Sequence, residues 1–144
     1  EAQMNVSTKG RYALRALTHL AESFLKNDNK PVSIKHISER ENISNRYLEN
    51  IFVTLRKASI IKSIKGEKGG FMLAKPPKDI SVYDVLEAVE KGVSPSKCVM
   101  NVKMCGNAQK CGIRKVWVGL DKVISGYLKQ TKLSEVAENH TPQK

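Results

Sequence analysis

Three cysteines lie close together in the sequence, at Cys98, Cys105 and Cys111. Thiolates are soft ligands that suit iron–sulfur clusters and zinc. The surrounding segment carries several lysines and arginines but no acidic residue, and such cations favour the thiolate form, which binds metals or reacts with oxidants. The short Cys-x2-Cys step of zinc ribbons is absent. The spacing therefore indicates a metal-cluster site, with reduced or redox-active thiols that hold no metal as the alternative.

Three cysteines leave such a cluster one protein ligand short, because a cluster usually takes four. No His, Asp or Glu lies in or beside the segment, and the histidines of the chain are His19, His36 and His140. The fourth ligand must therefore be a distant residue, belong to a partner chain or be a small molecule. His19 and His36 fall within helical patterns, where we expect packed or solvated side chains rather than ligands.

Two helices joined by a tight turn are predicted between residues 33 and 57. Ser33 and Ser44 can each accept a free backbone N–H of the helix that follows. The first helix covers Ile34–Glu41, and only three residues separate it from the second. Such a step lets the second helix enter a DNA major groove. Apolar residues share one face of that helix: Leu48, Ile51, Phe52 and Leu55. Polar residues share the other: Asn45, Arg46, Glu49, Asn50 and Arg56.

A β-hairpin is predicted next, with strands at Ile60–Lys65 and Phe71–Leu73 and a glycine-rich tip at residues 66–70. Residues 44–75 carry seven Lys or Arg against two acids. A polar-faced helix followed by a basic hairpin is typical of a winged helix-turn-helix that binds DNA. An ordinary amphipathic helix and hairpin is the less favoured alternative.

The N-terminal helix is predicted to run from Ser7 to about Lys26. Lys9 and Arg11 lie near its start, where backbone N–H groups favour anions, so a phosphate is one candidate for binding there. A screened surface charge is the other interpretation. Gly10 would allow a backbone or a phosphate to approach closely.

The C-terminal half begins with a linker at residues 74–79, after which Ser81 and Asp84 have the spacing of a capping box. Val82, Val85, Leu86 and Val89 form the core face of the helix that they start. A long helix is predicted at Ile113–Gln130 and a short one at residues 131–138. Residues 139–144 are predicted to form a flexible tail.

The long helix carries the strongest periodic pattern in the chain. Its apolar residues are Ile113, Val116, Trp117, Leu120, Val123, Ile124, Tyr127 and Leu128. This stripe presents more apolar surface than the core of one small domain needs. We therefore interpret it as a dimerisation helix, with packing inside its own chain as the alternative.

Length and charge fit a basic DNA-binding protein. The 144 residues suffice for one domain with a dimerisation appendage, and the net charge of +11 suits a polyanionic partner. No apolar run approaches the roughly 20 residues needed to span a bilayer, and no signal peptide is evident. An odd number of cysteines then favours reduced thiols and a cytoplasmic location. We expect no enzyme, because the sequence lacks a catalytic triad, paired carboxylates in a plausible pocket and a P-loop.

Five short stretches appear in the order seen in the Rrf2 family, and the chain resembles that family over residues 4 to about 138. They are Ser7–Ala13, Ile37–Arg40, Ile43–Ser44, Tyr47–Glu49 and Gly69–Phe71. The three-cysteine segment and the helix containing Trp117 are similar to the branch of IscR, the iron–sulfur cluster regulator. This resemblance implies a homodimeric winged-helix transcription regulator that binds imperfect palindromic operators.

The resemblance also implies particular site residues. It places a [2Fe-2S] cluster on Cys98, Cys105 and Cys111. Base-reading positions fall on Arg46, Glu49 and Asn50, and Lys65 is the wing residue that enters the minor groove. The IscR branch has a histidine ligand three residues after its last cysteine, where this sequence has Arg114. The nitric-oxide-sensing branch takes an Asp from near the N-terminus of the partner chain, and the matching position in this sequence is Arg11.

The sequence thus predicts a mainly α fold with a small β-hairpin wing, a winged helix-turn-helix plus a long C-terminal dimerisation helix. The predicted divisions are the DNA-binding domain at 4–79, the cluster-binding loop and dimerisation helix at 80–138, and the tail at 139–144. The predicted function is a repressor of iron–sulfur biogenesis or related redox or iron genes. A metal-free regulator of the same fold, sensing by cysteine oxidation or a protein partner, is the alternative. The predicted DNA-contacting residues are Lys9, Arg11, Ser44, Asn45, Arg46, Tyr47, Glu49, Asn50, Arg56, Lys65 and Lys68.

Overall fold

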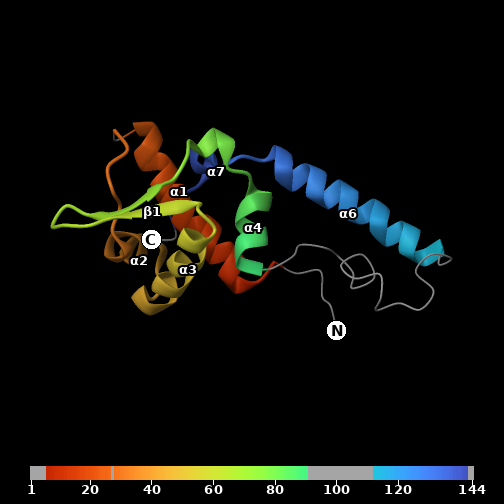
Figure 1. Cartoon of the computed structure of the whole chain (residues 1–144), viewed down its shortest axis with the longest axis horizontal. Helices are drawn as coiled ribbons and strands as arrows, with labels where there is room; N and C mark the ends of the chain where they lie inside the picture. Colours follow the sequence, from red (N-terminus) through yellow and green to blue (C-terminus); the bar gives the residue numbers. More distant parts are fainter. Residues whose placement is uncertain (1–5, 27, 91–111, 143–144) are drawn as a thin grey trace.

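The computed structural model describes residues 6–26, 28–90 and 112–142, and the three cysteines lie outside these ranges. Most of the described chain is helical, with one two-stranded antiparallel sheet (Figure 1). The mainly α fold with a small hairpin is confirmed. The elements are α1 (Thr8–Lys26), α2 (Ile34–Glu41), α3 (Asn45–Lys57), β1 (Ile61–Ile64), β2 (Gly70–Leu73), η1 (Pro77–Asp79), α4 (Val82–Glu90), α6 (Gly112–Gln130) and α7 (Leu133–Asn139).

The helix-turn-helix formed by α2 and α3 has the two predicted caps. The Ser33 hydroxyl accepts the His36 N–H at 3.1 Å, and the Ser44 hydroxyl accepts the Tyr47 N–H at 3.2 Å. Asn42 ends α2 in the left-handed conformation, with φ at 55°. Asparagine tolerates that region better than most residues, so the chain reverses within three residues and presents α3 at an angle to α2.

The hairpin pairs Ile61 with Leu73 and Ile64 with Gly70. Each strand bound lies within one residue of the predicted one. Gly70, the first residue of β2, has a φ of 154°, which suits glycine. Val32, in the loop before α2, exchanges two backbone hydrogen bonds with Phe71, at 2.8 and 2.9 Å. This bridge, which the sequence did not predict, attaches the hairpin to the helix-turn-helix.

The core is built around α1, which packs against α2, α3, α4, α7 and β2. Fully buried side chains come from both halves of the chain, including Leu17, Ile51, Leu86 and Leu133. The predicted capping box is present, because the backbone N–H groups of Ser81 and Asp84 each donate to the other residue's side chain at 3.0 Å. Helices α4 and α7 supply part of the same core, through residues such as Val85 and Leu133.

The C-terminal helix α7 returns to that core. The Leu133 N–H donates to Ile80 O at 2.9 Å, and the Val82 N–H donates to Thr131 O at 2.9 Å. The predicted linker at 74–79 contains η1, and Pro77 within it is buried. Asn139 belongs to α7, and His140, which the sequence placed in a flexible tail, contacts Glu41.

Helix α6 extends away from α7 along one side of the molecule (Figure 1). Lys129 near its end lies 4.6 Å from the ring centroid of Tyr83 in α4. No residue of α6 is buried within the described chain. Within the described residues, no helix has the length and apolarity that crossing a membrane requires.

Candidate nucleic-acid interface

The polar face of α3 is open to solvent. Seven predicted DNA-contacting residues in and next to this helix are exposed: Ser44, Asn45, Arg46, Tyr47, Glu49, Asn50 and Arg56. The opposite face is buried in the core through the four apolar residues expected there. Because burial fixes the rotation of the helix about its axis, the polar residues form one accessible surface.

The hairpin presents the other basic residues. Lys65 and Lys68 are exposed in the loop between β1 and β2, and this loop projects beyond the helices (Figure 1). The Gly69 N–H closes a turn by donating to Gly66 O at 3.0 Å. A Cβ at Gly69 would overlap the carbonyl oxygen of Ile64, so this tight loop requires glycine there.

The start of α1 is capped by groups of this chain. Ser7 caps the helix through Gly10 N–H, and the Ser7 N–H and hydroxyl both donate to Glu90 Oε1 at 2.6 Å. The carboxylate of Glu90 thus occupies the position near Ser7 where a phosphate was considered. Gly10 is buried, and a Cβ at this position would meet Leu86 and Glu90. This close packing explains the glycine better than the approach of a phosphate does.

Lys9 and Arg11 have different surroundings at this helix start. The Lys9 ammonium donates to the Thr54 hydroxyl on α3 at 3.3 Å. Arg11 is exposed and donates to the Thr8 hydroxyl at 3.2 Å. Lys9 therefore places a cation beside the exposed helix α3.

Two tyrosines link the beginning of α3 to α1. The rings of Tyr12 and Tyr47 meet edge to face, with centroids 5.4 Å apart. The guanidinium of Arg15 lies 5.0 Å from the Tyr12 ring centroid. Such aromatic and cation–π contacts each stabilise the fold by about 1 kcal/mol and orient the rings. Helix α1 therefore positions the first turn of α3.

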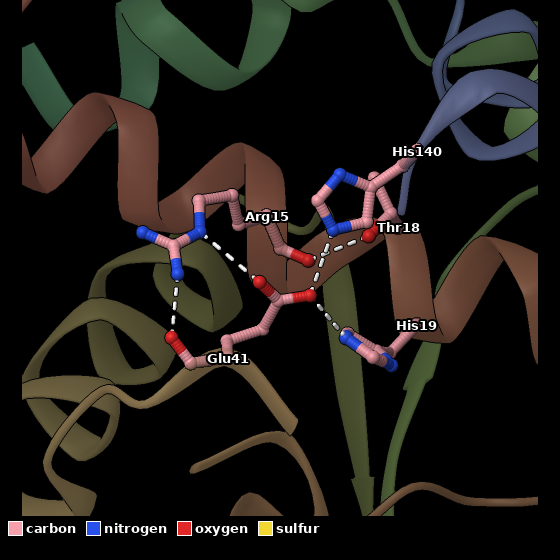
Figure 2. Close-up of polar contacts among 5 residues, drawn as sticks. All are labelled: Arg15, Thr18, His19, Glu41 and His140. Carbon is pink, nitrogen blue, oxygen red and sulfur yellow. Dashed lines mark hydrogen bonds and ion pairs between the residues drawn. The ribbon is translucent and has the colours of Figure 1, made fainter. Parts of the chain in front are cut away.

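Arg15 also reaches a buried polar cluster centred on Glu41, the last residue of α2 (Figure 2). The Glu41 side chain is fully buried. The Nε2 atoms of His19 and His140 each lie 2.7 Å from Glu41 Oε1. Arg15 Nε donates to Glu41 Oε2 at 3.1 Å, and Arg15 Nη2 donates to the Glu41 carbonyl oxygen. The carboxylate therefore receives hydrogen bonds from α1, through Arg15 and His19, and from the segment after α7, through His140.

The cluster shifts the titration of its members. Burial lowers the pKa of His19 below its ordinary 6.5, although the hydrogen bond to Glu41 opposes this change. Burial alone would raise the pKa of Glu41, but hydrogen bonds from His140, His19 and Arg15 outweigh it, so this pKa falls below 4.5. An ionised Glu41 can only accept hydrogen bonds. Both imidazoles therefore carry a proton on Nε2.

Sequence reasoning did not identify this cluster. His19 is packed and His36 is exposed, as expected for each. Glu41 carried no signal of its own, since a helix-terminal glutamate is commonly solvated, and His140 lies 99 positions later. Only the return of α7 onto α1 brings the two together.

The predicted cluster ligands lie outside the described residues, so their geometry is not part of the site shown here. Helix α6 begins at Gly112, next to Cys111, and its 19 residues span about 28 Å. The N-terminal end of α6, cyan in Figure 1, lies farther from α7 than its C-terminal end does. The three histidines gather near Glu41, with ring centroids 5.8 Å apart for His19 and His36 and 6.3 Å for His19 and His140.

Comparison with known proteins agrees with this architecture. Residues 6–139 match the family model described as Rrf2, iron-dependent transcriptional regulator. The chain belongs to the Rrf2 family. This Rrf2 protein is 37% identical to the HTH-type transcriptional regulator IscR of Cereibacter sphaeroides over 94% of the chain and 88% of that relative. It is 35% identical to IscR of Klebsiella pneumoniae strain 342, over 94% of the chain and 81% of the relative.

Solved structures support the same assignment. The global cysteine regulator CymR of B. subtilis superposes with a TM-score of 0.78 at 30% identity, covering 95% of this Rrf2 protein and 98% of CymR. IscR of T. potens superposes with a TM-score of 0.75 at 33% identity, covering 94% and 87%. The resemblance drawn from the sequence is therefore confirmed, and the chain is an IscR-like transcriptional regulator.

Proposed function

We propose that this Rrf2 regulator binds imperfect palindromic operators as a homodimer and senses its signal through a [2Fe-2S] cluster on Cys98, Cys105 and Cys111. The observation that carries the DNA-binding part is the exposed polar face of α3 beside an exposed basic hairpin loop. In this role the chain represses iron–sulfur biogenesis or related redox and iron genes from the cytoplasm.

The DNA contacts follow from the arrangement of α3 and the hairpin. A recognition helix reads base edges in the major groove, where Arg suits guanine and Glu can accept from cytosine. Arg46, Glu49 and Asn50 take these positions, and Lys65 reaches the minor groove. The remaining members of the interface contact or position the phosphate backbone: Lys9, Arg11, Ser44, Asn45, Tyr47, Arg56 and Lys68.

The dimer uses the apolar face that α6 leaves open. Four large apolar side chains on this helix are between 61% and 70% exposed: Ile113, Val116, Val123 and Tyr127. Glycines recur every seven residues at 112, 119 and 126, and a Cβ at each would meet no atom within 4 Å. These three glycines and four exposed apolar side chains are thus not explained by packing inside the described chain. A second copy of α6 would cover them.

The cysteine segment connects α4 to this dimer helix. Three thiolates fit an iron–sulfur cluster by ligand type, and the fourth ligand comes from outside the set because Arg114 replaces the histidine of the IscR branch. An exchangeable fourth ligand would make the bound group responsive to oxidants, nitric oxide or iron supply. A change in the segment between α4 and α6 would alter the spacing of the two α3 helices, on which half-site recognition depends.

A metal-free thiol sensor is the second candidate. A solved relative, CymR of Staphylococcus aureus, is described in an oxidized form, and this chain is 31% identical to it. In that case Cys98, Cys105 and Cys111 respond to oxidation directly, while α3 and the hairpin keep the same role on DNA.

The deciding experiment is an anaerobic absorbance spectrum of the full chain, with iron and sulfide quantified on the same sample. The proposal expects visible charge-transfer bands with two irons and two sulfides per chain, and their loss in a Cys98→Ser, Cys105→Ser, Cys111→Ser variant. A colourless protein that also resists anaerobic reconstitution would overturn the cluster and favour the thiol sensor. Salt-dependent, sequence-selective binding to duplex DNA tests the α3 interface separately.

A further inference from the structure

Two of the three histidines of the chain, His19 and His140, meet at one buried carboxylate, that of Glu41. His19 comes from α1, Glu41 from the end of α2 and His140 from the residue after α7, and Figure 2 shows the two imidazoles directed at Glu41. His36 lies beside His19 but makes no contact with Glu41 among the described interactions. We propose that His19, Glu41 and His140 form a binding site for a divalent transition-metal ion of the Zn²⁺ type, separate from the cysteine segment.

The ligand types suit such an ion. Two imidazoles and one carboxylate are a common set for zinc, with water as the fourth ligand. The three ligand atoms lie within 4.8 Å of one another. Tetrahedral coordination at about 2.0–2.2 Å places ligand atoms about 3.3 to 3.6 Å apart. The ligands need to move by only about an ångström to enclose the ion.

Arg15 prepares the carboxylate for this role. Its Nε donates to Oε2 and leaves Oε1 to the two imidazoles. Outer partners of this kind fix the orientation of a ligating carboxylate. Because Glu41 is fully buried and His19 is 7% exposed, both ligands have little freedom to turn away.

Access to the site comes from the side of His140. A cleft of about 460 Å³ borders this residue and is lined by Tyr127, Thr131, Glu135, Val136, Asn139 and His140. A bound ion could take its water ligand from this cleft. The His140 side chain is 17% exposed, which provides a path for the ion without unfolding the core.

The proton balance of binding is simple. Without metal, each Nε2 carries the proton that it donates to Oε1. On binding, a neutral imidazole moves this proton to Nδ1 and offers the Nε2 lone pair to the ion, while a protonated imidazole releases one proton to solvent. The site is therefore hydrogen-bonded when empty and coordinated when filled, with no change in redox state.

A metal ion at this site would join the segment after α7 to α1 and to the end of α2. His140 follows α7, whereas Glu41 ends the first helix of the helix-turn-helix, 99 positions earlier. An ion bound to both holds α7 against α1 and α2. Metal binding here requires neither a cluster on the cysteines nor DNA. This proposal is therefore independent of the proposed function.

The test uses the full chain with Cys98, Cys105 and Cys111 replaced by Ser, so that no thiol competes for metal. Calorimetric titration with Zn²⁺ is expected to show one ion per chain, and Co²⁺ is expected to give the intense visible absorption of a tetrahedral site. His140→Ala should lower Zn²⁺ affinity more than about tenfold, and His19→Gln provides a second ligand variant. His36→Ala is the matched control and should bind as the parent does.

Circular dichroism of each variant first establishes that it is folded. Absence of Zn²⁺ binding in the folded parent would overturn the site. Binding that survives both ligand variants, or that His36→Ala removes equally, would also overturn it, because the ion would then be held elsewhere.

Discussion

The imidazole of His140 lies 2.7 Å from the carboxylate of Glu41, although 99 positions separate them in the chain. This contact fastens the segment after α7 to the end of α2. The same carboxylate binds Arg15, whose guanidinium lies over Tyr12, and Tyr12 meets Tyr47 at the start of α3. The position of α3 is thus connected to the segment that follows α7.

Removing the Glu41 carboxylate should destabilise the protein strongly. Glu41→Ala leaves the buried His19 donor without its acceptor and removes the carboxylate that pairs with Arg15, at a cost of about 3 kcal/mol in the free energy of unfolding. Urea unfolding monitored by circular dichroism measures this difference. Glu39→Ala, at an exposed position of the same helix, should change stability by less than about 0.5 kcal/mol. Equal effects of the two variants would contradict the structural role of Glu41.

Stability should fall as the solution is acidified. Folded His19 resists protonation because burial lowers its pKa, so below about pH 6.5 the unfolded chain binds more protons and is favoured. Glu41, whose pKa is lowered from 4.5, adds a further loss as the pH falls through 4.5 and below. The other titratable groups that face His19 are Glu41, His36 and His140.

Unfolding in urea at pH 7.5, 6.5 and 5.5, with chelator present, measures the His19 contribution. His19→Gln should flatten the dependence between these values, and His36→Gln should alter it less. A stability that rises on acidification would show that His19 is favoured in its charged form.

Truncating the proposed DNA contacts should weaken operator binding while leaving the fold intact. Arg46→Ala should cost about 1–3 kcal/mol if Arg46 contacts a base. Lys65→Ala should reduce affinity and, if Lys65 neutralises a phosphate, lower the salt slope by about 1. Fluorescence anisotropy over a salt series measures both quantities. Lys78→Ala, an exposed change outside α3 and the hairpin loop, is the charge-matched control, and an equal loss with it would refute the assignment.

A methyl group at Gly10 should disturb the junction of α1 with α4. A Cβ there would overlap Glu90 Oε1 and lie 3.0 Å from Leu86 Cδ2. Glu90 would have to move away from Ser7, so Gly10→Ala should lower stability by about 1–3 kcal/mol. In a Glu90→Ala background the same change should cost less, because the overlapping group is absent. Thermal denaturation of the parent, the two single variants and the double variant completes this double-mutant cycle.

A charge on the open face of α6 should separate the proposed dimer. Val123 is 70% exposed, and Val123→Glu would bury a carboxylate if a second copy of α6 covers this face. Sedimentation should then show monomers, with helical content unchanged because no residue of α6 is buried within the described chain. Lys122→Gln changes the net charge by the same amount at an exposed position on the opposite face of the helix. Dimers that persist in Val123→Glu would place the interface elsewhere.

Local sequence patterns determined most of the elements. The caps at Ser33 and Ser44, the Ser81–Asp84 box and the buried face of α3 all depend on residues within a few positions of one another. Helix periodicity and capping act over that range, so the winged helix-turn-helix could be predicted from the chain alone. The assignment of the cysteines to a cluster came from ligand chemistry and resemblance and remains a prediction.

Tertiary structure decided which distant residues meet. Nothing near Glu41 in the sequence indicates that His140 is its partner, or that Glu90 rather than phosphate lies at Ser7. Both contacts follow from helices α4 and α7 packing on α1, where apolar burial from the two halves of the chain brings polar groups together. Burial then requires those groups to be hydrogen-bonded. The sequence by itself determined the helices and their faces, whereas only packing decided the Glu41 cluster.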